Sequence, residues 1–381
     1  MVKNVFTVSN LLGALHIKPR SSLFVFVGAI ALLTFHLDRP RSYKYDELAY
    51  IDGARALAHH LPDTNHEHPP LAKHLIELGI LAFGDNPIGW RFMPVLAGAS
   101  ALVVIFLWVS ELADIYTAWV AVALVVSNGF WFVMSRVAML SIFELFFCVL
   151  GFFLLHRERY ILSGAAFGLA TACRWNAVFA IALVIVYLLF SKVLKQALIV
   201  GVVSIFAYAI TWLPTIGFHP VSFVEANLYI FNFHHHAGLA FTVTASPWYK
   251  WIYQTSDNGW EWLAANPLIT LAGITGTLIL LQQRKHVLLA CSAPVFFFQW
   301  AVIRRPFTFY YYFLDTCIFL TIVAAFAVGK LRVYRSTPGD IAASTVALAL
   351  SGLWFAIHYA GFANLSSPWT IPLHILSLFG L

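Results

Sequence analysis

The chain alternates between long apolar runs and short polar stretches. Most runs approach the roughly 20 helical residues needed to cross a bilayer. The sequence lacks the short alternating segments of a membrane β-barrel. The pattern therefore predicts an all-α, polytopic membrane protein with about eleven transmembrane helices. The predicted spans are 22–38, 92–110, 115–134, 138–155, 161–174, 177–190, 196–217, 267–282, 287–303, 309–329 and 341–361.

One apolar run is interrupted by polar residues. Arg174-Trp175-Asn176 divides the stretch from Leu162 to Phe190. A single tilted helix would hold the arginine near the middle of the bilayer, which costs several kcal/mol. The interruption therefore predicts a turn between two short helices.

Two polar segments, 39–90 and 218–266, are long enough to be loops outside the membrane. In the first, Leu71 to Phe83 has helical periodicity with partial apolarity, which is typical of a helix lying in the interface. The second is rich in histidine, tryptophan and tyrosine, and the two aromatic types favour the headgroup level. Without a repeat or linker between soluble parts, we expect a single membrane domain over residues 1–381.

Composition supports a membrane protein. Hydrophobic residues make up 61% of the chain and the mean hydropathy is +0.80, whereas soluble domains are roughly 45–50% apolar. The net charge of +6 is spread over the loops, which argues against a nucleic-acid partner. The four cysteines fall inside apolar runs, so we expect small core residues rather than disulfides or metal ligands.

The acidic residues indicate the orientation. Lysines and arginines are almost evenly divided between the two sides of the predicted membrane, so they do not decide it. Placing the N-terminus in the cytoplasm gives simple basic loops inside and mixed charge outside, where we expect the chemistry. The acids that then share the outer side are Asp46, Glu47, Asp52, Asp63, Glu67, Glu77, Asp85, Glu225, Asp257 and Glu261.

An acidic pair, Asp46-Glu47, follows the first predicted span. Only 10% of the residues are charged, and adjacent carboxylates at a membrane edge are costly to keep there. Two interpretations remain open. The pair could cap a helix that begins here, or a carboxylate could act as a general base that takes the proton of a hydroxyl nucleophile.

Several arginines are predicted at the outer edge of the membrane. Arg91 lies where the first long loop re-enters the bilayer, and Arg136, Arg174 and Arg304-Arg305 would lie at the same depth. An arginine at the end of a span often extends to the interface. Guanidinium also binds phosphate bidentately and keeps its charge at low dielectric. Four such sites in one leaflet favour an anionic substrate.

The histidines favour a hydrogen-bonded site over a metal site. His66 and His68, and the run His234-His235-His236, could supply ligands. Their spacing fits no specific zinc pattern, and adjacent histidines do not easily share one metal. We therefore expect no metal and no other cofactor.

Together these motifs resemble the protein O-mannosyltransferases. The resemblance extends from Tyr45 to about Leu320 and preserves the family's motif order. Its early motifs are Asp46-Glu47, His68-Pro69-Pro70-Leu71-Ala72-Lys73, Arg91 and Ser135-Arg136-Val137-Ala138-Met139-Leu140. Its later motifs are His235 to Trp251, Asn266-Pro267-Leu268 and Arg305-Pro306-Phe307-Thr308-Phe309-Tyr310-Tyr311-Tyr312.

The resemblance implies a GT-C type membrane glycosyltransferase. Such enzymes transfer mannose, with inversion, from a polyprenyl-phosphate donor to Ser or Thr hydroxyls of proteins. By position, Asp46 would be the catalytic base, Glu47 an acceptor-binding partner and Arg91 a ligand of the donor phosphate. The resemblance makes Arg136 and Arg305 further phosphate candidates. Other site candidates from the same motifs are His68, Lys73, His235 and Trp248.

The chain also departs from this family. Many relatives have an aspartate where Ser141 stands here, with Glu144 three residues on. The second long loop is too short for the β-trefoil of eukaryotic members, which indicates a compact relative in a prokaryotic cell membrane. A related transferase with a lipid or cell-wall glycan acceptor remains an alternative. A transporter is disfavoured because few charges, Glu144 and Asp315, lie near mid-span.

Overall fold

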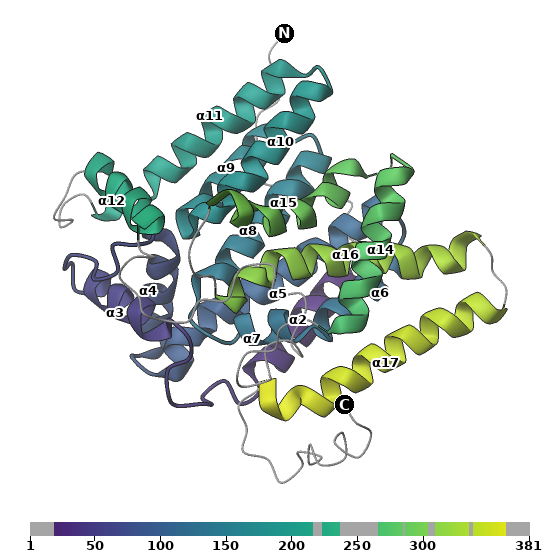
Figure 1. Ribbon diagram of the computed structural model, residues 1–381. Coiled ribbons are helices and arrows are strands. Elements are labelled where there is room, and N and C mark those ends of the chain that lie inside the picture. Colours follow the sequence, from purple (N-terminus) through teal and green to yellow (C-terminus); the bar gives the residue numbers. More distant parts are fainter. Residues whose placement is uncertain are drawn as a thin grey trace.

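The computed structural model describes residues 19–215, 223–236, 266–284, 286–303, 309–334 and 338–362. Within these ranges the regular elements are α-helices and short 3-10 turns, labelled η (Figure 1). In chain order they are α2 (Pro19–Thr34), α3 (Glu47–Ala58), α4 (Leu71–Phe83), α5 (Pro87–Leu112), α6 (Ile115–Val126), α7 (Gly129–Met134), α8 (Leu140–His156), α9 (Tyr160–Cys173), η1 (Trp175–Ala177), α10 (Val178–Phe190), α11 (Leu194–Ile210), η2 (Leu213–Thr215), α12 (Phe223–His236), α14 (Pro267–Gln282), α15 (Val287–Ile303), η5 (Tyr310–Phe313), α16 (Leu314–Tyr334) and α17 (Pro338–Phe362).

The all-α prediction is confirmed, with one predicted span divided. The run 115–134, predicted as one helix, forms α6 and α7 with Ser127 and Asn128 between them. The Asn128 side-chain carbonyl caps α7 by accepting from the Phe130 N–H at 3.0 Å. Its amide donates to Thr321 Oγ1 of α16 at 3.1 Å. A buried asparagine whose polar atoms are satisfied in this way stabilises a break inside the bundle.

The bundle is built around α16. In Tyr311–Val328, 94% of the residues are buried, whereas 22% are buried in the most apolar stretch of Leu194–Thr215 at the edge of the bundle. These two segments and Pro87–Leu112 are the described helices long and apolar enough to cross a membrane. The exposed side chains of α11 are largely apolar, which suits contact with lipid. The chain is therefore an integral membrane protein. As expected, its cysteines are unpaired, and three are buried: Cys148, Cys173 and Cys317.

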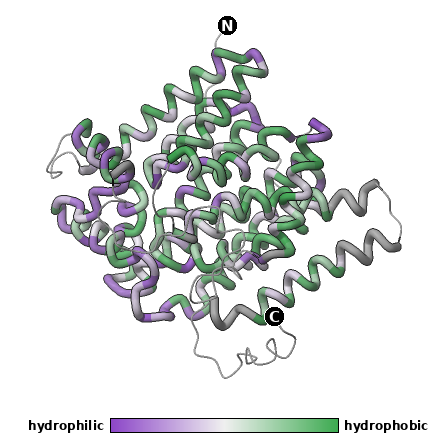
Figure 2. The backbone as a smooth tube through the Cα atoms, in the orientation of Figure 1, coloured by the Kyte–Doolittle hydropathy of each residue, from purple (hydrophilic) through white to green (hydrophobic). Residues whose placement is uncertain are grey.

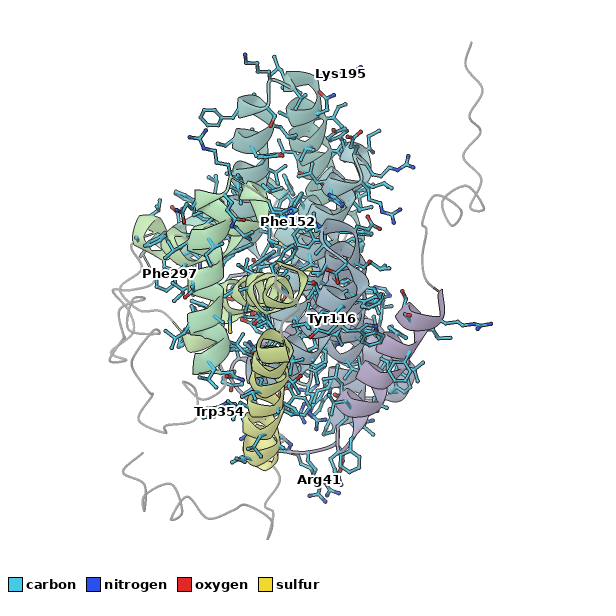
Figure 3. All side chains as sticks on the ribbon, turned by 90° about the vertical axis from the view of Figure 1, so that its right-hand side faces the viewer. Arg41, Tyr116, Phe152, Lys195, Phe297 and Trp354 are labelled. Atoms are coloured by element: carbon cyan, nitrogen blue, oxygen red, sulfur yellow. The ribbon has the colours of Figure 1, made fainter. Side chains whose placement is uncertain are left out.

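Polar residues gather at two opposite ends of the bundle. Figure 2 shows hydrophilic positions around α3, α4 and α12, and again at the α10–α11 and α14–α15 turns, with a hydrophobic zone between them. Figure 3 places Arg41, from the first long loop, and Lys195, from the start of α11, at opposite ends. An apolar belt between two polar ends matches the environment that a bilayer provides.

The first long loop folds into α3 and α4, and α4 coincides with the predicted interfacial helix. Lys73 of α4 is fully buried. Its ammonium donates to the His68 carbonyl at 2.9 Å and to the Asn65 carbonyl, and it pairs with Asp63. Burial lowers the pKa of Lys73, and the Asp63 carboxylate opposes this effect. All three ammonium donors are thus engaged, which fixes the backbone that carries His68.

Candidate active site

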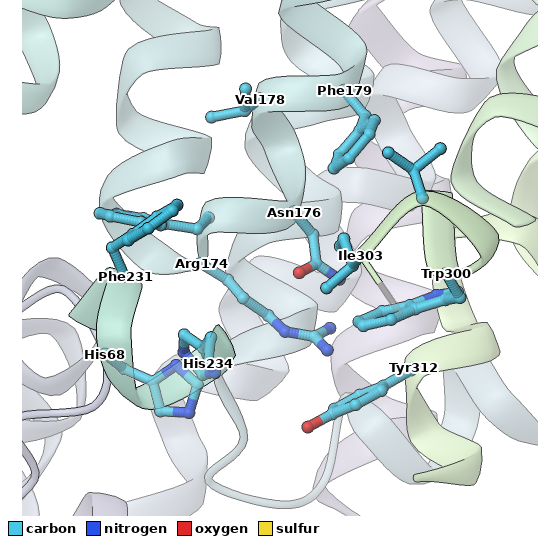
Figure 4. Close-up of a pocket in the computed structure, with 12 residues that line it drawn as sticks. His68, Arg174, Asn176, Val178, Phe179, Phe231, His234, Trp300, Ile303 and Tyr312 are labelled. Atoms are coloured by element: carbon cyan, nitrogen blue, oxygen red, sulfur yellow. The ribbon is translucent and has the colours of Figure 1, made fainter. Parts of the chain in front are cut away.

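A cavity of about 500 Å³ opens near the polar end that carries α3, α4 and α12. Its walls come from the α9–α10 turn, α12, the end of α15 and η5 (Figure 4). They combine aromatic side chains with a small number of polar groups, as in many ligand sites. The lining residues are His68, Arg174, Trp175, Asn176, Val178, Phe179, Phe231, His234, Trp300, Val302, Ile303 and Tyr312.

The turn predicted at Arg174-Trp175-Asn176 supplies the cavity's cation. α9 ends at Cys173, Arg174 is extended, and η1 leads into α10. The Arg174 guanidinium donates to Ser141 Oγ and Glu144 Oε2, both at 3.3 Å, and lies 4.3 Å from the Tyr312 ring centre. Arg174 is almost fully buried yet lines the cavity. An arginine held by long hydrogen bonds beside an open volume can accept an anionic ligand.

Asn176 adds a second donor to the same wall. Its side-chain Nδ2 is buried and has no hydrogen-bond partner among the residues that the structure describes. In Figure 4 the Asn176 amide and the Arg174 guanidinium lie on the same side of the cavity as Trp300. The wall also includes Val178 at the N-terminal end of α10, where the helix dipole favours negative charge. The site is therefore suited to a phosphate.

Asp46 lies beside this cavity and does not act as a helix cap. It occupies the N-cap position of α3, but its side chain makes no capping hydrogen bond. Asp46 Oδ2 instead accepts hydrogen bonds from the hydroxyls of Tyr50, at 3.4 Å, and Tyr311. The Tyr50 hydroxyl is also 3.5 Å from His68 Nε2, and the Tyr311 ring packs against Tyr312 at 4.9 Å between centroids. One intermediary residue on each side thus connects Asp46 to a cavity-lining side chain.

Tyr50 has a defined protonation state. Burial raises its pKa well above the usual value, and the nearby Asp46 carboxylate raises it further. The phenol therefore stays protonated near neutral pH and donates its hydrogen bond. This holds the Asp46 carboxylate in one orientation without a formal positive charge.

Glu47 and Arg91 form a buried pair apart from the cavity lining. The guanidinium binds Glu47 bidentately, with two N···O distances of 2.8 Å. Its other N–H groups donate to the carbonyls of Leu37, Pro40 and Ser42. All five donors of Arg91 thus have protein partners, so the expected role as a phosphate ligand does not fit this arrangement.

Glu47 is saturated in the same way. Its carboxylate accepts from Arg91 and from the backbone N–H groups of Lys44 and Ala138, each at 2.8 Å. It ties the start of α3 to the segment before α8. The resemblance implied that Glu47 binds the acceptor. This role does not fit a side chain that is fully buried and whose carboxylate oxygens are already hydrogen-bonded within the protein.

Arg136 stabilises the end of the first helix. Its guanidinium donates to the carbonyls of Leu33, Phe35 and His36, at 2.6 to 2.8 Å. These carbonyls belong to the last turn of α2 and the residues that follow it, where cations and N–H donors are favoured. The geometry gives this arginine a capping role in place of the expected phosphate contact.

Two further residues predicted from the motifs, His68 and Lys73, adjoin the cavity, and His234 lies beside them. His68 lines it, and Lys73 holds the His68 backbone. His234, named above only as a possible metal ligand, lines the cavity, donates from Nε2 to the Glu67 carbonyl at 2.8 Å and packs on the His68 ring. The His235 side chain, Arg305 and Trp248 lie outside the described residues.

The sequence pattern alone did not indicate site contacts for Asn176, Tyr50, Tyr311 or Tyr312. Asn176 carried a usable signal, because a polar residue inside an apolar run is costly unless it has a partner. The tyrosines carried less, since aromatic residues are common at both edges of a membrane. In the described part of the chain, no three His, Cys, Asp or Glu side chains gather as metal ligands would. The expectation of no metal stays a prediction.

Comparison with known families supports the resemblance. Residues 67–215 match the family model described as dolichyl-phosphate-mannose-protein mannosyltransferase. A polyprenol-phosphate-mannose–protein mannosyltransferase of Mycolicibacterium smegmatis is 36% identical over 97 residues, covering 24% of this chain and 18% of that protein. Its counterpart in Corynebacterium glutamicum is 36% identical over 93 residues, with the same coverage of 24% and 18%. The resemblance to protein O-mannosyltransferases is thus confirmed, over a segment that spans less than a fifth of these relatives.

Solved structures show the same fold over most of the chain. ArnT from Cupriavidus metallidurans, bound to undecaprenyl phosphate, superposes with a TM-score of 0.62 at 14% identity. The superposition covers 90% of this chain and 65% of the ArnT chain. The Archaeoglobus fulgidus oligosaccharyltransferase, in complex with Zn and sulfate, gives a TM-score of 0.59 at 14% identity, covering 90% of this chain and 53% of its own. The fold is therefore the GT-C fold of membrane glycosyltransferases.

Proposed function

We propose that this protein transfers mannose from a polyprenyl-phosphate donor to Ser or Thr hydroxyls of a protein. The reaction takes place in the cavity beside Asp46, on the outer face of a prokaryotic cell membrane, with the N-terminus in the cytoplasm. The observation that carries the proposal is a carboxylate, Asp46, connected through Tyr50 to a cavity whose wall is compatible with phosphate. The family match over residues 67–215 supplies the substrate class.

The donor's phosphate binds at the α9–α10 turn. Arg174 and Asn176 offer a guanidinium and an amide donor there, and Tyr312 and Trp300 form a stacked aromatic surface with ring centroids 4.6 Å apart. Aromatic surfaces suit the apolar face of a sugar ring, and the apolar lining accepts the first part of the lipid. Charge that develops on the leaving phosphate is stabilised by the same donors.

Asp46 accepts the proton of the attacking hydroxyl. Both tyrosines bind its Oδ2, and within the described residues no group binds Oδ1, which can face an incoming hydroxyl. The acceptor oxygen bonds to C1 of mannose as the C1–phosphate bond breaks, and the proton passes to Asp46. The polyprenyl phosphate leaves with the bonding electrons. This single displacement inverts the anomeric centre and needs no covalent enzyme intermediate.

A transfer assay tests the proposal. The protein in lipid nanodiscs is incubated with radiolabelled polyprenyl-phosphate-mannose and a Ser/Thr-rich peptide. We expect transfer by the wild type and a loss of about 10²- to 10⁴-fold in Asp46→Asn, the range for removal of a general base. Asp52→Asn is the matched control, since this carboxylate is half-exposed on the same helix and pairs with Arg55.

Each outcome of this assay tests a separate part of the proposal. Undiminished transfer by Asp46→Asn would reject the base. Transfer of mannose to a lipid or a glycan, with none to peptide, would replace the acceptor and keep the site. Absence of transfer to every acceptor from a mannosyl donor that binds would reject the proposed reaction.

A further inference from the structure

Two buried carboxylates lie behind the cavity wall, inside the membrane-spanning helices. Glu144 of α8 and Asp315 of α16 are fully buried. Glu144 Oε2 accepts from Arg174 at 3.3 Å, while Glu144 Oε1 and both Asp315 oxygens have no hydrogen-bond partner in any other residue that the structure describes. Asp315 lies in the first turn of α16, where the helix dipole gives partial compensation.

The charges of this cluster do not balance. Both carboxylates interact electrostatically with Arg174, a single positive charge. Two ionised carboxylates and one guanidinium would leave one negative charge unpaired among fully buried side chains, which is strongly unfavourable. The cluster becomes neutral when one of the carboxylates binds a proton. The pair therefore holds one proton when the cavity is empty.

An anionic ligand changes this balance. A phosphodiester bound to Arg174 adds a negative charge within reach of the same guanidinium, and Glu144 then competes with the ligand for it. The cluster regains neutrality if the second carboxylate also binds a proton. We propose that Glu144 and Asp315 are positioning residues that hold Arg174 toward the empty cavity and take up one proton when the donor's phosphate binds. This inference rests on the proposed donor site.

Other titratable groups around the pair do not supply this proton. Cys148 of α8 and Cys173 of α9 interact with Glu144, and Tyr50 and Tyr312 interact with Arg174. Thiols and phenols are uncharged near neutral pH. Histidine is the residue type whose ordinary pKa lies near neutral pH, and His68 and His234 across the cavity would strengthen anion binding if they gained a proton there. The experiment must therefore separate them from the carboxylates. The charged and titratable groups around the pair and across the cavity are Arg174, Cys148, Cys173, Tyr50, Tyr312, His68 and His234.

Donor binding as a function of pH tests the inference. The probe is polyprenyl-phosphate-mannose, a phosphodiester whose own charge is constant between pH 6 and 8. If binding takes up one proton, the Kd of the wild type increases about ten-fold for each unit by which the pH is raised, over the range in which the pair titrates. The double variant Glu144→Gln/Asp315→Asn keeps the side-chain volumes and both histidines, so we expect tighter binding with little dependence on pH. Glu111→Gln, at the distant end of α5, is the control and should keep the wild-type slope.

A second measurement uses the wild type alone. Calorimetry of donor binding in buffers of different ionisation enthalpy gives the number of protons taken up, which we expect to be about one near pH 7. Donor binding without proton uptake would overturn the inference. An unchanged dependence of the Kd on pH in the double variant would also overturn it, and would assign that dependence to the histidines. Absence of donor binding at every pH would instead reject the proposed donor site.

Discussion

At the scale of single residues, adjacent acids have different surroundings. Asp46 is half-exposed, faces two phenols and lies beside the cavity, whereas Glu47 is fully buried against a guanidinium. Because successive positions at the start of a helix point in different directions, one carboxylate lies beside the cavity and the next is enclosed by protein groups. The proposed base is thus anchored by its buried neighbour.

We predict that Glu47→Gln destabilises the protein. The substitution leaves Arg91 buried with its charge uncompensated, which costs about 3–5 kcal/mol for a buried pair. Thermal unfolding in detergent should show a large drop in Tm, whereas Asp52→Asn, which breaks a half-exposed pair worth about 1 kcal/mol or less, should show little. An unchanged Tm with weakened acceptor binding would restore Glu47 to a role in recognition.

The sequence pointed to the region that holds the candidate site but did not show which groups each arginine contacts. Arg91, Arg136 and Arg174 all occur at the edges of apolar runs. Whether such an arginine faces backbone carbonyls or a ligand depends on where a distant segment passes. The carbonyls of Pro40 and Ser42, which occupy Arg91, are positioned by the path of a loop that has no periodic pattern.

At the scale of elements, close helix packing positions the Arg174 turn. Gly164 and Gly168 of α9 face α11, and the Ser204 hydroxyl donates to the Gly164 carbonyl at 2.9 Å. Small residues four apart let two membrane helices approach closely. The end of α9, and with it Arg174, is therefore set by its contact with α11.

Gly168→Ala tests this packing. A Cβ at this position would lie 2.4 Å from the Ser204 carbonyl oxygen, so the two backbones must separate, at a cost of about 1–3 kcal/mol. We expect a lower Tm and weaker donor binding. Gly28→Ala is the control, because a Cβ there meets no atom within 4 Å. Equal behaviour of the two variants would show that α9 and α11 can separate without consequence.

Helix positions followed from periodicity more reliably than helix breaks. Apolar runs fixed the spans to within a few residues, and the interfacial helix α4 was predicted with its correct bounds. The break at Ser127-Asn128-Gly129 was missed, because the apolar run continues on both sides of this short turn signal. The Asn128 side chain has its partners, Cys317 and Thr321, about 190 positions away, so their contribution is visible only after folding.

At the scale of the whole molecule, the two polar ends differ in character. In the part of the chain that the structure describes, one end carries the acid-rich loop and the cavity, and the other carries the short α10–α11 turn (Figure 2). Translocated loops tolerate mixed charge, whereas short basic loops are retained in the cytoplasm. This asymmetry supports the orientation in the proposed function.

Accessibility in intact cells tests the orientation. In a background without the native cysteines, Leu61→Cys should react with a membrane-impermeant maleimide, since Leu61 is exposed in the acid-rich loop. Ser191→Cys, in the exposed α10–α11 turn, should react only after the cells are opened. The reverse pattern would place the cavity on the cytoplasmic face.

The hydrogen bond between Tyr311 and Asp46 joins residues 265 positions apart. Membrane helices are inserted as translation proceeds, so Asp46 enters the membrane edge long before the segment that carries its partner. The cavity wall formed by α15 and η5 is also among the later parts to be synthesised. A nascent chain therefore has its carboxylate in place without the wall that faces it. The proposed site is therefore complete only after the segment that carries Tyr311 has joined the bundle.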